Sequence, residues 1–289
     1  MANFQGSKIN PKSFSTSQLK FYFILVPLAI FMILPVVFII NQAFKPLGEL
    51  FAFPPTLFVK DPTMENFRDL FGLSGITGVP MSRYLFNSFF IAITTVCLNL
   101  IITITGAYAL SKKKFKLKGT LLNMNQMALM FVATAVSVPR YIVIVQTGLI
   151  NSWFAHILPL IAMPVGLFLV KQFVDQIPDA LIEAAVMDGA NDWTIVRKVI
   201  IPLTKPALAT SIVLTFQTVW NATEASNNFI TSDAMRTLAF YLNSISTNNT
   251  IAASGMVAAA AVILFLPNLI IFIMMQSQVM NTMTHSGIK

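Results

Sequence analysis

The stretch EAAVMDGANDWTIVRKVIIPL, from Glu183 to Leu203, is the most charged part of a chain that is otherwise strongly apolar. Just before it, Pro178 suits the first position of a helix, where its missing N–H needs no partner. Gly189 ends that helix, because a residue without a Cβ takes the left-handed conformation cheaply. Asn191 or Asp192 then caps a second helix. The stretch therefore predicts a helix–turn–helix hairpin between apolar segments.

The composition places this hairpin in a membrane protein. Apolar residues make up 56% of the 289 residues and charged residues only 10%, whereas soluble domains carry roughly 25% charged residues. So little charge cannot cover a soluble surface, and we expect an all-α, multi-pass membrane protein. The single cysteine, Cys97, excludes a disulfide framework. His156 and His285 lie too far apart in the sequence to suggest a metal cluster.

Six apolar runs are candidates for membrane-spanning helices, since a span needs roughly 20 mostly apolar residues. They cover residues 21–44, 84–110, 121–146, 153–174, 207–223 and 251–275. The first run is too long for the apolar part of a signal peptide, and no small-residue cleavage site follows it. We expect a cytoplasmic tail over residues 1–20 and one transmembrane domain over residues 21–289, with the hairpin loop over about 175–205.

The positions of lysine and arginine predict the orientation in the membrane. Basic residues precede the first run, follow the second and lie between the fourth and fifth, and with six spans all of these fall on one side. That side is cytoplasmic by the positive-inside rule, so we expect both termini and the hairpin there. The group after the second run is interpreted as a topology signal that also contacts lipid phosphates. Its members are Lys112, Lys113, Lys114, Lys116 and Lys118.

The net charge of +8 raises the question of a nucleic-acid partner. The basic residues are scattered between apolar runs and form no patch interleaved with aromatic residues. This pattern argues against nucleic acid and favours membrane lipid as the partner of the positive charge.

The segment between the first two runs is expected on the outer side. Pro54 and Pro55 exclude a long helix at its start. Thr63 can cap a short amphipathic helix in which Asn66 and Arg68 are exposed. Such a helix would lie on the membrane surface or against a partner.

The hairpin is larger than a simple connection needs, since helix connections commonly have about 2–8 residues. The small side chains of Ala184 and Ala185 allow another surface to approach closely, and Glu183 offers a carboxylate to a cationic partner. These features favour a docking element, with a plain connector as the alternative.

The hairpin resembles the EAA loop of ABC importer permeases, whose pattern is EAA, a gap, G, a gap and I-x-L-P. Val199 stands where that family usually has isoleucine, and Ile201 where it usually has leucine. ENFRDLF (65–71), LFNSFFIA (85–92), AYALSKKKF (107–115), GLINSW (148–153) and VWN (219–221) also resemble the carbohydrate-uptake branch, the maltose-type second permease, so the resemblance covers nearly the whole chain. The residues on the EAA pattern are Glu183, Ala184, Ala185, Asp188, Gly189, Ala190, Pro202 and Leu203.

The resemblance implies a type I importer permease fold and a division of labour. This chain and a second, homologous permease would form the path, two ATPase subunits would bind ATP and Mg, and an extracellular binding protein would deliver a sugar or oligosaccharide. Glu183 would pair with a basic residue of the ATPase, and Gly189 would permit the turn. The chain has no G-x-x-x-x-G-K-[ST] loop, so we expect no ATP hydrolysis and no cofactor in it. The expected location is the bacterial cytoplasmic membrane.

Polar residues in or near the spans suggest where a solute would pass. Arg140 either lines the path, where it could bind a polar or acidic solute, or snorkels to the outer surface. Trp220 and Asn221, with Glu224 beyond them, either contact a sugar or belong to an interfacial aromatic belt with a hydrated loop.

Other classes of protein fit less well. An ion-coupled secondary transporter would need paired carboxylates at mid-membrane, and no Asp or Glu lies within the six predicted spans. A membrane-embedded enzyme would need a nucleophile–base or metal constellation, which two separated histidines do not supply. An ABC permease for a non-sugar solute stays open as an alternative.

Overall fold

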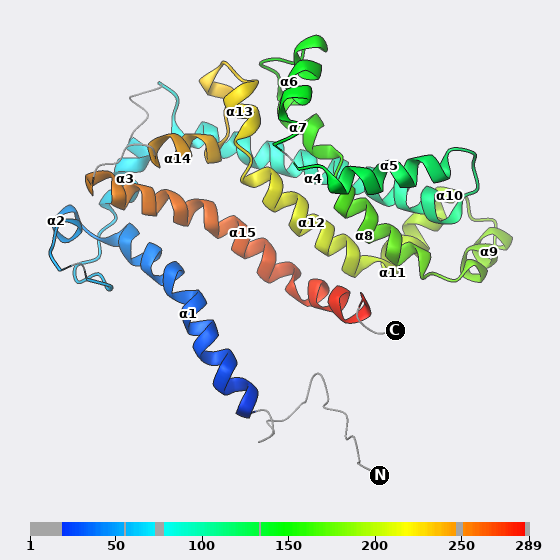
Figure 1. The fold of residues 1–289 in the computed structure, drawn as a ribbon, viewed down its shortest axis with the longest axis horizontal. Coiled ribbons are helices and arrows are strands. Elements are labelled where there is room, and N and C mark those ends of the chain that lie inside the picture. Colours follow the sequence, from blue (N-terminus) through cyan, green and yellow to red (C-terminus); the bar gives the residue numbers. More distant parts are fainter. Residues whose placement is uncertain (1–18, 55, 73–77, 133, 247–250, 287–289) are drawn as a thin grey trace.

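The structure is a computed structural model that describes residues 19–54, 56–72, 78–132, 134–246 and 251–286. Within these residues the chain is helical and has no strand, which confirms the predicted all-α class (Figure 1). Most of the predicted N-terminal tail, residues 1–18, lies outside the described residues. The helices are α1 (Leu19–Phe44), α2 (Leu47–Leu50), α3 (Glu65–Gly72), α4 (Met81–Lys112), α5 (Lys118–Met130), α6 (Ser137–Gln146), α7 (Trp153–Ile161), α8 (Pro164–Asp175), α9 (Asp179–Met187), α10 (Asp192–Ile195), η3 (Val196–Ile200), α11 (Ile201–Leu203), α12 (Lys205–Trp220), α13 (Glu224–Asn228), η4 (Asp233–Met235), α14 (Leu238–Ser246) and α15 (Ile251–Ser286).

Three single helices are long and apolar enough to cross a membrane: Phe21–Phe44 in α1, Met81–Lys112 in α4 and Ser254–Val279 in α15. Two bent helix pairs also qualify. One joins α7 to α8 with a bend of 42°, and the other joins Asp192–Leu203 to Lys205–Asn228 with a bend of 85°. The described residues therefore hold three to five candidate spans, and the predicted count of six is not confirmed.

The third predicted span, residues 121–146, is not one helix, and the prediction was wrong in this respect. α5 ends at Met130 and α6 begins only at Ser137. In a continuous helix Pro139 would have no N–H for the carbonyl of Ala135, and its ring would collide with that carbonyl. In α6 the proline lies in the first turn, where the N–H groups have no intrahelical partner to lose. Starting a new helix therefore accommodates the proline.

The break between α7 and α8 is held by polar side chains from two other helices. Pro164 is the first residue of α8 and offers no N–H to the carbonyls of α7. The carbonyl of Ile161 at the break accepts a hydrogen bond from Asn99 Nδ2 of α4 at 2.6 Å. Asn99 Oδ1 in turn accepts one from Thr215 Oγ1 of α12 at 3.1 Å. Both side chains are buried, so the break is part of the packed core.

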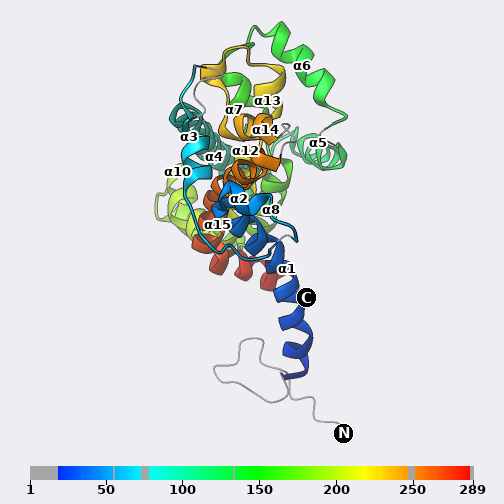
Figure 2. The ribbon, with the colours of Figure 1, turned by 90° about the vertical axis from the view of Figure 1, so that its left-hand side faces the viewer.

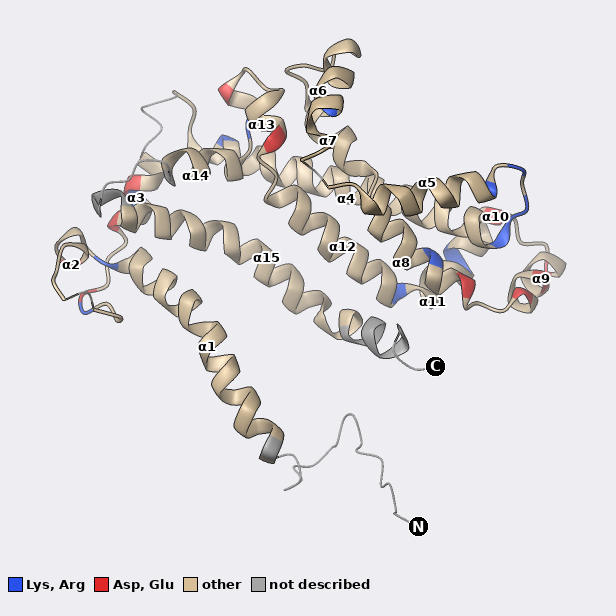
Figure 3. Cartoon of the chain, viewed as in Figure 1, with Lys and Arg blue, Asp and Glu red and all other residues tan. Residues whose placement is uncertain are grey.

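The helices α4, α8, α12 and α15 pack side by side, and α1 and α6 project from this bundle in both views (Figure 1, Figure 2). Charged residues gather near α2 and α3 at one end and around α9, α10 and α11 at the other (Figure 3). The long stretches of α1, α12 and α15 between those ends carry almost no charge (Figure 3). Such an uncharged band between two charged ends is what a bilayer requires.

The short helix α3 corrects one prediction about its side chains. Arg68 is exposed as expected, but Asn66 is buried. Asn66 Nδ2 donates hydrogen bonds to the carbonyls of Ala43 and Lys45, at 2.9 and 2.8 Å. These carbonyls lie at the end of α1, where a helix has no internal partners for them. Asn66 therefore ties α3 to α1 instead of facing solvent.

Candidate functional site

The predicted hairpin consists of α9 and of a second arm that runs through α10, η3 and α11. Pro178 is the residue just before α9, one position earlier than predicted. Gly189 has a φ of +81°, the left-handed conformation expected of it, and the N–H groups of Gly189 and Ala190 bond to the last turn of α9 at 2.9 Å. Asn191 caps α10, since its Oδ1 accepts from the N–H of Thr194 at 2.8 Å. The turn and the cap are thus confirmed.

α9 lies on the outside of the molecule, and none of its residues is buried. Its apolar side chains Val186 and Met187 are 55% and 87% exposed. Apolar residues gathered on a surface that lies at the charged end of the molecule are typical of a protein–protein contact. Of the residues on the EAA pattern, Ala185 and Ala190 are half-buried, and the others are exposed: Glu183, Ala184, Asp188, Gly189, Pro202 and Leu203.

The second arm anchors the hairpin to the bundle. Ile195, Val196 and Ile200 are buried in a cluster that also contains side chains of α4 and α8. The turn η3 is π-helical, and the arm then meets α12 at the 85° bend. The hairpin therefore has one exposed arm and one packed arm.

α6 and α13 bring together two of the residues proposed from sequence for the solute path. Arg140 Nη1 donates to Glu224 Oε2 at 2.5 Å across a separation of 84 residues in the chain. Their side chains are 24% and 34% exposed, so the ion pair is partly shielded from water. The other carboxylate oxygen, Glu224 Oε1, is buried and bonds to no group in the described ranges of the chain. An anionic solute at Arg140 would compete with Glu224 for the guanidinium or bind its other N–H groups.

A cavity of about 480 Å³ lies beside Arg140. Its walls are mainly apolar and come from α6 and α7, with Val143, Phe154 and Leu158 among them. The cavity gives the arginine an apolar setting, in which a charge has a strong preference for a partner.

Trp220 and Asn221 differ in accessibility. Trp220 is only 1% exposed. Its ring stacks on Phe216 at 5.4 Å between centroids, and its Nε1 donates to the carbonyl of Leu264 at 3.1 Å. This geometry gives Trp220 a packing role and no face for a sugar in this conformation. Asn221 is exposed and remains accessible to a solute.

Residues 26–279 match the protein family described as Binding-protein-dependent transport system inner membrane component. The chain belongs to this family. It is therefore a membrane permease component of a transport system, and such a component is not an enzyme.

Curated relatives and one solved structure resemble this permease over most of its length. It is 28% identical over 257 residues to the sulfoquinovosyl glycerol transport system permease protein SmoH of Agrobacterium fabrum, across 88% of each chain. It is 28% identical over 265 residues to the trehalose transport system permease protein SugB of Mycobacterium tuberculosis, across 89% of this chain and 92% of the relative. The crystal structure of a bacterial ABC transporter involved in the import of the acidic polysaccharide alginate contains a chain with a TM-score of 0.78 and 22% identity, which covers 92% of this chain and 99% of that chain. The ABC importer permease fold expected from the resemblance is confirmed.

Sequence reasoning missed two groups of residues in the permease. It searched the spans for ionisable side chains and so passed over Asn99, which a lone amide in an apolar run could have signalled. It also treated the lysines after α4 as one topology signal. Lys112 and Lys113 in fact bind carboxylates of the hairpin, and the acidic residue at the start of each hairpin helix was a possible signal for these pairs.

Proposed function

We propose that this permease forms half of the translocation path of an ATP-driven importer for a sugar or oligosaccharide. A second, homologous permease supplies the other half, and two ATPase subunits bind ATP and Mg and dock against the hairpin. An extracellular binding protein delivers the solute. The complex lies in the bacterial cytoplasmic membrane, with the hairpin and both termini in the cytoplasm.

The exposed arm of the hairpin is the observation that carries this proposal. α9 exposes Val186, Met187 and the carboxylate of Glu183 at one charged end of the molecule, while Ile182 and Ala185 of the same helix pack against the buried cluster. The second arm is packed against α4 and α8. A force applied to α9 by a docked ATPase would therefore act on helices of the transmembrane bundle.

The nature of the solute is supported by the relatives and by the ion pair near the cavity. SmoH and SugB are permeases of sulfoquinovosyl glycerol and trehalose transport systems. Arg140, Glu224 and the exposed Asn221 are the polar groups that we assign to the solute path. An acidic sugar could exchange its own carboxylate for that of Glu224 on Arg140, since a guanidinium binds either one in the same geometry.

Purification of the tagged permease from its own cells tests the composition of the importer. We expect an ATPase and a second, similar permease to copurify, and ATP hydrolysis to rise when the loaded binding protein is added. Solute movement by the purified permease alone, driven by a proton or sodium gradient, would contradict the proposal. A binding protein loaded with a non-sugar solute would favour the alternative cargo class.

Substitutions at Gly189 test the docking role of the hairpin. A Cβ at this position meets no heavy atom within 4 Å, so backbone strain and not collision decides the outcome. Gly189→Val should largely abolish recovery of the ATPase with the permease, because the left-handed conformation costs an L-residue about 1–2 kcal/mol and a β-branched one more. Gly189→Asn should retain most of it, because asparagine tolerates that conformation. The measurement is ATPase recovered per permease at equal expression, and equal recovery for both variants would contradict docking through this turn.

A further inference from the structure

The lysine-rich segment at the end of α4, residues 111–118, forms a connection to α5 that we name the lysine turn. Its first three residues each face a carboxylate from a different helix. These carboxylates belong to the end of α8, the start of α9 and the start of α10. Three consecutive residues at the end of α4 thus reach three successive helices. The pairs are Ser111 Oγ to Asp175 Oδ1 at 2.6 Å, Lys112 Nζ to Asp179 Oδ1 at 2.7 Å and Lys113 Nζ to Asp192 Oδ1 at 2.6 Å.

Lys112 is aimed inward at the start of the exposed hairpin arm. Its Nζ donates both to Asp179 Oδ1 and to the carbonyl of Ile177, the latter at 2.5 Å. The Lys112 side chain is only 9% exposed, whereas that of Asp179 is 78% exposed. A lysine in this position is poorly placed to contact lipid phosphates and well placed to hold the first turn of α9.

Lys113, Tyr108 and Asp192 contact one another at the start of the second hairpin arm. Asp192 Oδ1 accepts from Lys113 Nζ and also from the hydroxyl of Tyr108, at 3.0 Å. Lys113 Nζ lies 5.5 Å from the centre of the Tyr108 ring. Tyr108 is 5% exposed and belongs to α4. The second arm is therefore tied to α4 through two side chains that also contact each other.

The carboxyl groups of these pairs stay ionised at neutral pH. The hydrogen bond from Lys112 holds the pKa of Asp179 below its usual range, and the hydrogen bonds from Lys113 and Tyr108 do the same for the pKa of Asp192. A carboxyl group with a lowered pKa adds stability above its unfolded-state pKa and loses it only as the pH falls through the lowered value. An exposed ion pair by itself contributes little to stability. Two pairs on separate arms, however, restrict the orientation of the hairpin.

We propose that Lys112 and Lys113 are positioning residues that lock the hairpin to the end of α4, so that the hairpin and α4 move as one body. The inference rests on the proposed function, in which the hairpin receives the movement of an ATPase. Without the lock, the hairpin could pivot at the 85° bend before α12, and part of that movement would not reach α4.

The test measures the distance between α4 and α9 by electron paramagnetic resonance in the assembled transporter. Spin labels are attached to the native Cys97 on α4 and to a Met187→Cys substitution at the end of α9, both of which are exposed. Cysteines in the partner subunits are replaced. We expect one narrow distribution of the distance between the two labels, and we expect it to stay the same when Mg-ATP and orthovanadate trap the complex. In the variant that combines Lys112→Ala with Lys113→Ala, the narrow distance should be lost and the distribution should respond to trapping.

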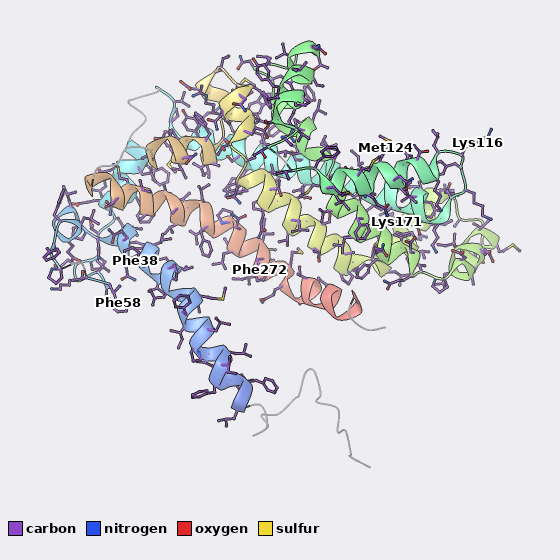
Figure 4. All side chains as sticks on the ribbon, viewed as in Figure 1. Phe38, Phe58, Lys116, Met124, Lys171 and Phe272 are labelled. Atoms are coloured by element: carbon purple, nitrogen blue, oxygen red, sulfur yellow. The ribbon has the colours of Figure 1, made fainter. Side chains whose placement is uncertain are left out.

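Four further variants separate the lock from a general loss of positive charge. Lys116→Ala removes a positive charge of the lysine turn that takes part in neither pair. The Lys116 side chain projects outward at the tip of the α4–α5 connection (Figure 4), so the narrow distance should persist. Lys112→Arg with Lys113→Arg should preserve it as well. Lys113→Asp should broaden it, and addition of Asp192→Lys to that variant should restore it by reversing the pair.

The lock is overturned if the double alanine variant keeps a narrow distance that ignores trapping, or if the distance shifts on trapping with both lysines intact. Failure of the reversed pair to restore the distance in assembled complexes also overturns it. Failure of an ATPase to copurify would instead count against the proposed function. In that case the full-length permease, labelled at the same two positions, still reports whether the lysines hold the hairpin.

Discussion

At the scale of single residues, the ion pair between Arg140 and Glu224 determines which atoms of the two side chains already have a partner. The arginine is already bound to a carboxylate through Nη1, which balances its charge. The carboxylate, in contrast, has one buried oxygen that receives no hydrogen bond from the described part of the chain. That oxygen could accept a hydrogen bond only after a rearrangement that exposes it.

Substitution of Arg140 alone should lower the stability of the permease more than removal of both charges of the pair. Arg140→Leu leaves the partly buried carboxylate of Glu224 without its cation, which costs about 1–3 kcal/mol. The double variant Arg140→Leu with Glu224→Gln should recover part of that loss. Thermal unfolding of the permease in detergent measures the effect as a double-mutant cycle. Arg68→Leu on the exposed face of α3 is the matched control and should leave the unfolding temperature unchanged. Additive effects of the two changes would show that the pair does not stabilise the permease.

The residue scale also separates what the sequence could predict from what it could not. The turn at Gly189 and the cap at Asn191 were predictable, because the residues that form them are neighbours in the chain. The partners of Arg140 and Lys113 were not, because each lies about 80 residues away and is brought close only by helix packing. The two alternatives for Trp220, a sugar contact or an interfacial belt residue, stayed open because a sequence does not show which face of an aromatic ring is covered.

At the scale of elements, the break between α7 and α8 depends on a polar contact inside the core. Asn99 supplies the donor that the carbonyl of Ile161 would otherwise lack, and Thr215 fixes the orientation of the amide. Non-helical backbone at membrane depth is tolerated where it is buried in protein in this way. The contact joins α4, α7 and α12 at one point.

Loss of this contact should destabilise the permease. Asn99→Ala leaves the carbonyl of Ile161 without its donor and should cost about 1 kcal/mol, near the values measured for hydrogen bonds between helices in membranes. The measurement is the unfolding temperature in detergent. Cys97→Ala lies two residues away on the exposed face of α4 and is the matched control. The same unfolding temperature for both variants would show that the break holds without Asn99.

Elements were predictable where one apolar run is one helix, as in α1 and α4. They were not predictable where a run is interrupted, because the mean apolarity of a window hides a break of a few residues. Pro139 carried the local signal for the division between α5 and α6, and Pro164 carried it for the bend before α8. The sequence could not show which side chains of other helices stabilise each break.

At the scale of the whole molecule, the directions of the long helices bear on which side of the membrane the termini and the hairpin occupy. α1 runs toward the end that holds α2 and α3, and α15 runs away from it (Figure 1). α4 and α8 end side by side at the opposite end, where Ser111 binds Asp175. Between the end of α4 and the start of α8, the chain therefore runs back from this end through α5 and α6, although these two do not form one helix. This arrangement is consistent with the expectation that both termini share the side of the hairpin.

Cysteine labelling tests that orientation. In a Cys97→Ser background, a membrane-impermeant maleimide should label Asp61→Cys in intact cells, because the proposed orientation places the segment after α2 on the outer side. Lys116→Cys should be labelled only after the cells are permeabilised, because the lysine-rich side stays in the cytoplasm. Both positions are exposed in the structure, so accessibility alone does not separate them. Labelling of Lys116→Cys in intact cells would reverse the assigned orientation.

The projection of α1 has a consequence for the choice of lipid. Its apolar stretch of 24 residues is about 36 Å long at 1.5 Å per residue, roughly 6 Å more than the hydrocarbon of an average bilayer. A helix that is longer than the hydrocarbon layer is thick can tilt relative to the membrane normal. Because α1 contacts the rest of the chain along one side, it can tilt without disturbing the core around Asn99. A thinner or thicker bilayer should therefore change the inclination of α1 before it changes anything else in the permease.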